Sequence, residues 1–133
     1  MSWETIDLTS VSTALEIIPE KTFTFELLPG AKYDERDPNR ISCQAAIVQD
    51  GEFTGRRIFF SYPDPSVKEW SPKALKRLEQ AIGIDIERGE DPVTYLNRVA
   101  GNHFMTNVTH SKPTDEYPNP RANLNLFNVK PAA

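Results

Sequence analysis

Residues 41–62, ISCQAAIVQDGEFTGRRIFFSY, form the stretch of sequence that decides the fold. Apolar side chains recur at every second position over 41–49 and again over 56–62, a period typical of β-strands with one buried face. The Asp50-Gly51 pair between the two segments is typical of a tight turn. The stretch therefore predicts two neighbouring strands joined by a short loop.

The same alternation recurs on both sides of this stretch, and a helical period interrupts it. Ser71 and Pro72 favour the start of a helix, because a hydroxyl residue caps it and proline suits its first turn. A shorter helix begins at Asp91-Pro92. In order, the predicted elements are strands at 22–28, 41–49 and 56–62, a helix at 71–82, a shorter helix ending at Gly101, and strands at 103–111 and 123–130.

Five strands with helices between the third and the fourth predict a mainly β fold, a five-stranded OB-fold-like barrel. Barrels of this kind bind oligonucleotides or oligosaccharides on the face of strands two and three and with flanking loops. We expect this domain to span 14–130. Residues 1–13 show little periodicity and are expected to form an N-terminal arm, and 131–133 a short tail.

The charge of the chain is unevenly distributed. The 133 residues suit one domain, and the net charge of -4 excludes a uniformly basic nucleic-acid coat. Residues 1–40 contain eight acidic and four basic residues, whereas 41–80 contain five acidic and six basic ones. A local basic groove in the middle third of the chain is therefore compatible with the acidic total.

Few residues are suited to catalysis or metal binding. Cys43 is the only cysteine, which favours a reducing compartment, and its place on an apolar strand face predicts a buried, inert thiol. His103 and His110 point to opposite faces of their strand, and no zinc or phosphate-loop motif is present. We expect a protein that is not an enzyme, with no metal, no cofactor and no membrane span.

Three motifs carry a resemblance to a known family. They are Phe25 to Gly30 followed by Tyr33, the DGE-x-x-GR segment within 48–59, and the helix end within 75–84. Together they resemble small bacteriophage proteins of the single-stranded DNA-binding or replication-accessory type. The resemblance implies an OB-like barrel acting on single-stranded DNA in the cytoplasm of the host cell, with replication or recombination proteins as further partners.

Single-stranded nucleic acids are held by basic groups and by aromatic rings on which bases stack. The strand at 56–62 offers both, but Phe60 and Tyr62 share one face and Phe59 lies on the other. The sequence leaves open which face lines the core. The candidate DNA-binding residues are Arg56, Arg57, Phe59 and Tyr62 of this strand, Tyr33, Arg36 and Arg40 before the second strand, Trp70 before the first helix, and Lys112, Tyr117 and Arg121 in the loop at 112–121.

Alternatives stay open for both residues and function. Arg57 suits a solvated position, Trp70 suits packing against the start of the helix, and Tyr117 suits packing within its loop. The alternative function is a protein-interaction, virion or anti-defence module without nucleic-acid binding, which the acid-rich 31–40 segment favours. A third is a small-nucleotide or oligosaccharide site, which requires a deep closed pocket. Self-association is also left open.

Overall fold

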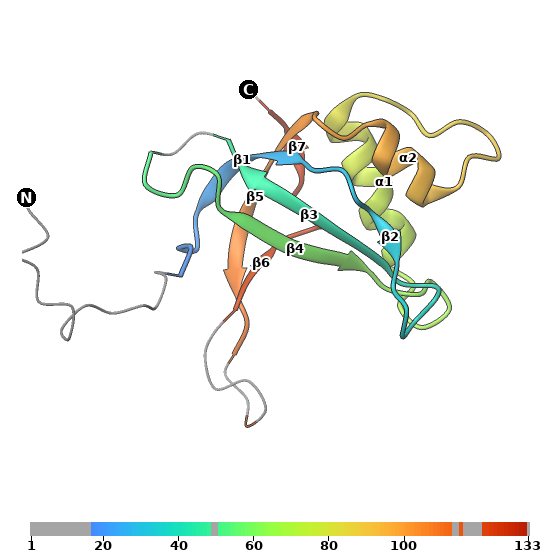
Figure 1. The fold of residues 1–133 in the computed structure, drawn as a ribbon, viewed down its shortest axis with the longest axis horizontal. Coiled ribbons are helices and arrows are strands. Elements are labelled where there is room, and N and C mark those ends of the chain that lie inside the picture. Colours follow the sequence, from blue (N-terminus) through green and yellow to red (C-terminus); the bar gives the residue numbers. More distant parts are fainter. Residues whose placement is uncertain (1–16, 49–50, 113–114, 116–120, 133) are drawn as a thin grey trace, which may run out of the picture.

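Strand β3 (Ile41–Ile47) is an inner strand of the sheet and is paired along both of its edges (Figure 1). One edge pairs antiparallel with β4 (Arg57–Tyr62), and the other with β1 (Thr22–Leu27) and β2 (Lys32–Tyr33). The strands predicted on either side of the Asp50-Gly51 turn are therefore confirmed. The computed structural model describes residues 17–48, 51–112, 115 and 121–132, so the predicted arm at 1–13 lies outside the described residues.

The strands occupy five positions in the sheet, two of which are filled by interrupted strands. β1 and β2 follow one another along the same edge of β3. In the same way, β6 (Ala122–Leu124) and β7 (Lys130–Pro131) lie along one edge of β5 (His103–His110), whose other edge pairs with β1. The order across the sheet is β4, β3, β1 with β2, β5, and β6 with β7.

This order confirms the predicted mainly β, OB-fold-like architecture. The helices α1 (Ser71–Ile82) and α2 (Pro92–Arg98) stand between β4 and β5 in the chain. The sheet curls until β4 and β6 approach each other, yet no backbone ladder joins them within the described residues (Figure 1). The barrel is therefore open along one seam. None of the described helices has the length and apolar character that crossing a membrane requires.

The core forms because alternate residues of every long strand point inward. The rings of Phe25 on β1 and Phe104 on β5 stack with centroids 5.8 Å apart at the middle of the barrel. Helix α1 buries Ala74 and Leu78 against one end of the barrel. Its N-cap is Trp70, one position before the Ser71 that the sequence predicts as the cap, so Ser71 is the first helical residue and lies buried. Burial of these apolar side chains is the main source of stability.

The last predicted strand, 123–130, is wrong in its middle, where the chain turns between β6 and β7. The Asn125 side chain accepts a hydrogen bond from the Phe127 amide at 3.1 Å, the local bond that Asn uses to form turns. The buried Thr106 hydroxyl donates to the Asn125 carbonyl at 2.6 Å and holds this turn against β5. Side-chain hydrogen bonds therefore replace part of the ladder here.

The Thr106 bond is directly testable. Replacement of Thr106 by valine keeps the shape of the side chain and removes the donor, so we expect the free energy of unfolding to fall by about 1 kcal/mol. Urea denaturation measures it, with Thr22→Val, at an exposed position of β1, as the matched control. An unfolding midpoint of Thr106→Val equal to that of the control would contradict this role.

Candidate functional site

The register of β4 decides which of its faces is exposed. Phe60 and Tyr62 are buried together with Ile58, so Arg57 and Phe59 face outward. Phe59 has an exposed fraction of 74%, the largest among the described large hydrophobic side chains. An aromatic ring and a guanidinium group therefore lie on one exposed strand face, which is the arrangement that single-strand binding requires.

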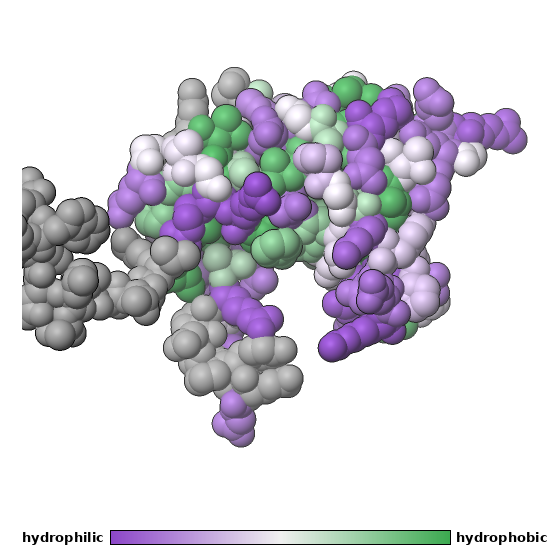
Figure 2. All heavy atoms as spheres, in the orientation of Figure 1, coloured by the Kyte–Doolittle hydropathy of each residue, from purple (hydrophilic) through white to green (hydrophobic). Residues whose placement is uncertain are grey.

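The outer face of β3 and β4 surrounds this pair with small or uncharged side chains. Phe59 lies directly opposite Gln44, and Arg57 lies opposite Ala46. In the strand order of OB-folds, β3 and β4 correspond to strands two and three. The outer face of these two strands is where such barrels bind their ligands. Figure 2 shows hydrophobic side chains among hydrophilic ones over the strands, whereas the neighbouring loops are mostly hydrophilic.

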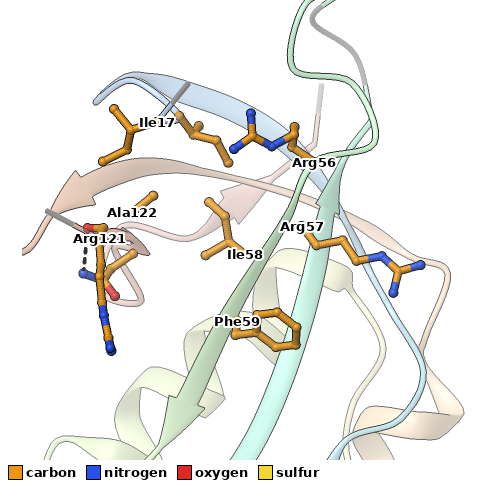
Figure 3. A pocket seen from close by; sticks show the side chains of 9 residues that line it. Ile17, Arg56, Arg57, Ile58, Phe59, Arg121 and Ala122 are labelled. Carbon is orange, nitrogen blue, oxygen red and sulfur yellow. Dashed lines mark hydrogen bonds between the residues drawn. The ribbon is translucent and has the colours of Figure 1, made fainter. Parts of the chain in front are cut away.

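A first hollow of about 380 Å³ lies on one side of Phe59, at the seam between β4 and β6. Its basic groups come from both ends of the sheet (Figure 3). Arg57 begins β4 and Arg56 directly precedes it, whereas Arg121 directly precedes β6. The Phe59 ring stands between the side chains of Arg57 and Arg121 in this view. The other lining residues are Ile17, Ile18, Ile58, Ala122 and Asn123.

The guanidinium groups of this hollow differ in their surroundings. Arg56 lies over the ring of the buried Phe53, 5.9 Å from its centroid. Arg57 makes no hydrogen bond or ion pair with any residue that the structure describes. The backbone of Arg121 is held to β5, where its carbonyl accepts from the Ser111 amide at 2.9 Å. The hollow thus combines an apolar floor with positive charge, which suits an anionic ligand with an apolar part.

Two further hollows continue from Phe59 toward β2. The second, of about 270 Å³, is lined by Phe59, Gln44 and Lys32 among others. The third contains Lys32 and Arg36, but also Asp34 and Glu35. The pKa of Asp34 is lowered, first because its carboxylate accepts a hydrogen bond from the Arg36 amide at 2.8 Å. A permanent negative charge makes the third hollow a poor phosphate site.

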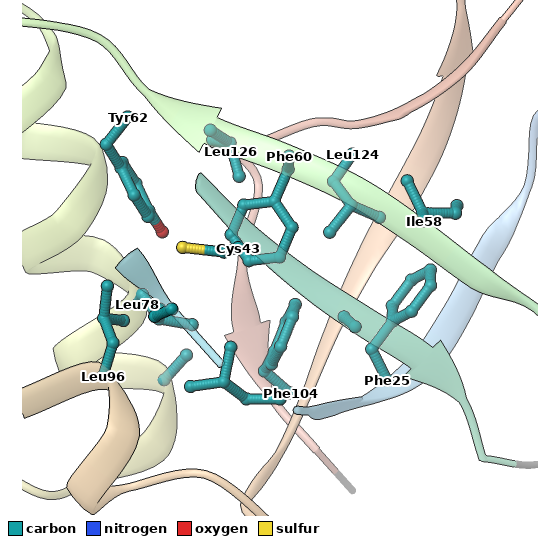
Figure 4. Close-up of a cluster of buried hydrophobic side chains, with 14 of the residues drawn as sticks. Phe25, Cys43, Ile58, Phe60, Tyr62, Leu78, Leu96, Phe104, Leu124 and Leu126 are labelled. Atoms are coloured by element: carbon teal, nitrogen blue, oxygen red, sulfur yellow. The ribbon is translucent and has the colours of Figure 1, made fainter. Parts of the chain in front are cut away.

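Several candidate residues lie elsewhere. The prediction that Tyr62 binds DNA is wrong, because the side chain is buried in the core and no base can stack on it. Its hydroxyl points toward Cys43 and has no hydrogen-bond partner within the described chain (Figure 4). Trp70 is half-buried and packs edge-on against Phe127 with ring centroids 5.1 Å apart, in agreement with its structural interpretation. Of Phe59, Tyr62 and Trp70, only Phe59 is therefore largely exposed.

Tyr33, Arg36, Arg40 and Lys112 line neither of the first two hollows. The Tyr33 hydroxyl donates to Asp91 at 2.6 Å, and this bond is the main cause that raises the Tyr33 pKa to about 12. Arg40 faces Asp37 at 3.8 Å. Lys112 is exposed beyond the end of β5, and Tyr117 lies outside the described residues. The structure thus brings together Arg56, Arg57, Phe59 and Arg121.

Gln44 was missed by sequence reasoning, although its signal was present. It occupies an outward position in the alternation of β3, and only the pairing with β4 shows that it faces Phe59. Within the described residues, no three His, Cys, Asp or Glu side chains gather as metal ligands would. No protein-family model and no curated protein matches the chain.

Cys43 lies beneath this face, and its chemistry is testable. Burial raises the pKa of its thiol to about 12, so the thiol stays protonated at mildly alkaline pH, far below that value. We expect the native chain to react with a disulfide reagent far more slowly than the chain unfolded in urea, since the thiolate is the reactive form. Cys43 is the only cysteine, so the absorbance of the released thiol reports on it alone. Equal rates in the two states would contradict its burial.

Proposed function

We propose that this protein is a non-catalytic single-stranded DNA-binding protein that holds the strand against the outer face of β3 and β4. The observation that carries the proposal is Phe59, 74% exposed, beside the exposed side chain of Arg57 and between two hollows. With the family resemblance of the sequence, this supports an accessory role in phage replication or recombination in the host cytoplasm. Proteins of those processes would be its further partners.

In this proposal the first hollow and the ring of Phe59 bind different parts of the strand. Phosphates lie near Arg56, Arg57 and Arg121 at the seam, where the guanidinium groups neutralise them. A base stacks on Phe59, whose backbone is held in the pairing of β3 and β4. Such stacking contributes about 1–3 kcal/mol of binding free energy for each base.

A protein-interaction module is the second candidate, and the third hollow, which carries both acidic and basic side chains, favours it. A protein partner would also use the exposed ring of Phe59, with Asp34 and Glu35 meeting basic groups of the partner. The two functions differ in their dependence on Arg57, because a backbone of phosphates requires positive charge and an apolar contact does not.

The first test removes the stacking ring. Phe59→Ala should weaken the binding of fluorescein-labelled oligothymidine by about 1–3 kcal/mol, measured by fluorescence anisotropy at low salt. The control is Val67→Ala, because Val67 is 72% exposed yet lines none of the hollows described above. Wild-type protein that binds no oligothymidine at low salt would overturn the proposed function, and an unaffected Phe59→Ala variant would overturn the stacking role.

The second test concerns charge. The affinity should fall as salt rises, and Arg57→Ala should reduce the slope of log affinity against log salt by about 0.7, the value for one phosphate of a single strand. The control is Arg88→Ala, an exposed arginine in the loop between α1 and α2. A slope that Arg57→Ala leaves unchanged would contradict a phosphate contact and favour the protein-interaction module.

A further inference from the structure

The second hollow lies where the edge of a base stacked on Phe59 would point. Gln44 is directly opposite Phe59 in the register of β3 and β4. Lys32 belongs to β2, which pairs with the other edge of β3. It lies opposite Ser42, two residues before Gln44 on β3. These side chains border one open hollow, and none of its lining residues is acidic. They are Gly30, Lys32, Ser42, Cys43, Gln44 and Phe59.

The backbone fixes the wall of this hollow. Between β1 and β2, the side-chain oxygen of Asn97 on α2 accepts hydrogen bonds from the amides of Gly30 at 2.9 Å and Ala31 at 3.1 Å. Gly30 has φ +100, a conformation that favours glycine, and a Cβ there would lie 3.8 Å from the Gln44 amide nitrogen. Since glycine has no side chain, the space beside Gln44 stays open.

The polar groups of the hollow differ in what they accept. The Gln44 amide has both a donor and an acceptor, so it pairs with the edge of any base. The Lys32 ammonium has three donors and no acceptor. It therefore binds O4 of thymine or O6 of guanine, whereas the corresponding positions of cytosine and adenine carry amino groups, N4 and N6, which present another donor.

We infer that Lys32 makes this face prefer keto bases, thymine and guanine, over amino bases, cytosine and adenine. The inference rests on the proposed function, because it requires a base stacked on Phe59. Lys32 then acts as a specificity-determining residue, while Arg57 and Arg121 contact phosphates and treat all bases alike.

The most direct comparison is oligothymidine against oligocytidine of equal length, because the two bases share one ring size and differ at positions 3 and 4, besides the 5-methyl group of thymine. Wild-type protein should bind oligothymidine more tightly by anisotropy at low salt. Lys32→Met should reduce the ratio of the two affinities by about threefold to tenfold, the value of one hydrogen bond. Lys32→Arg, which also offers only donors, should keep the ratio.

Arg57→Met is the matched control for a lost positive charge on the same face, and it should weaken both strands equally and leave their ratio unchanged. If wild-type protein binds neither strand, the proposed function itself fails. If both strands bind but Lys32→Met leaves the ratio as in wild type, or lowers it no more than Arg57→Met does, base discrimination by Lys32 is overturned while strand binding stands.

Discussion

The pairing of β3 along both of its edges is the interaction on which the rest of the structure depends. It sets the register of β4, and with a side-chain period of two that register places Phe60 in the core and Phe59 in solvent. A slip of one residue would exchange the two faces, burying Arg57 without a partner. The core and the exposed surface of β4 thus have the same origin, because the residues that it buries determine what its outer face presents.

Polar side chains form hydrogen bonds with the backbone at the two places where the ladder of the sheet is interrupted. Asn97 satisfies the backbone at the break between β1 and β2, and Asn125 with Thr106 does so between β6 and β7. Each break lets the sheet bend, which a continuous strand would resist. The breaks therefore explain how short strands form a curled barrel, and the first of them also leaves the space beside Gln44.

Local patterns in the sequence predicted the elements well, and the site less well. Alternation and helix-start residues depend on neighbours in the chain, so strands, helices and their order were predictable. The exposed face of β4 was not, because both faces carry aromatic residues and only the distant β1, β5 and α1 determine which is covered. The burial of Phe53 and the hollow at the seam likewise depend on tertiary curling. The break at Asn125 had a local signal, the three asparagines at 123, 125 and 128, that alternation outweighed.

The open seam gives the barrel a property that a closed one lacks. Arg57 and Arg121 belong to opposite ends of the sheet, and they border one hollow only while the sheet is curled. Binding in that hollow and curling of the sheet are thermodynamically linked. A ligand that spans the seam stabilises the native state, and any loosening of the curl weakens the binding of that ligand. Because no ladder joins β4 and β6 in the part of the chain that the structure describes, a ligand bound across the seam would make the stability of the curled barrel rise with ligand concentration.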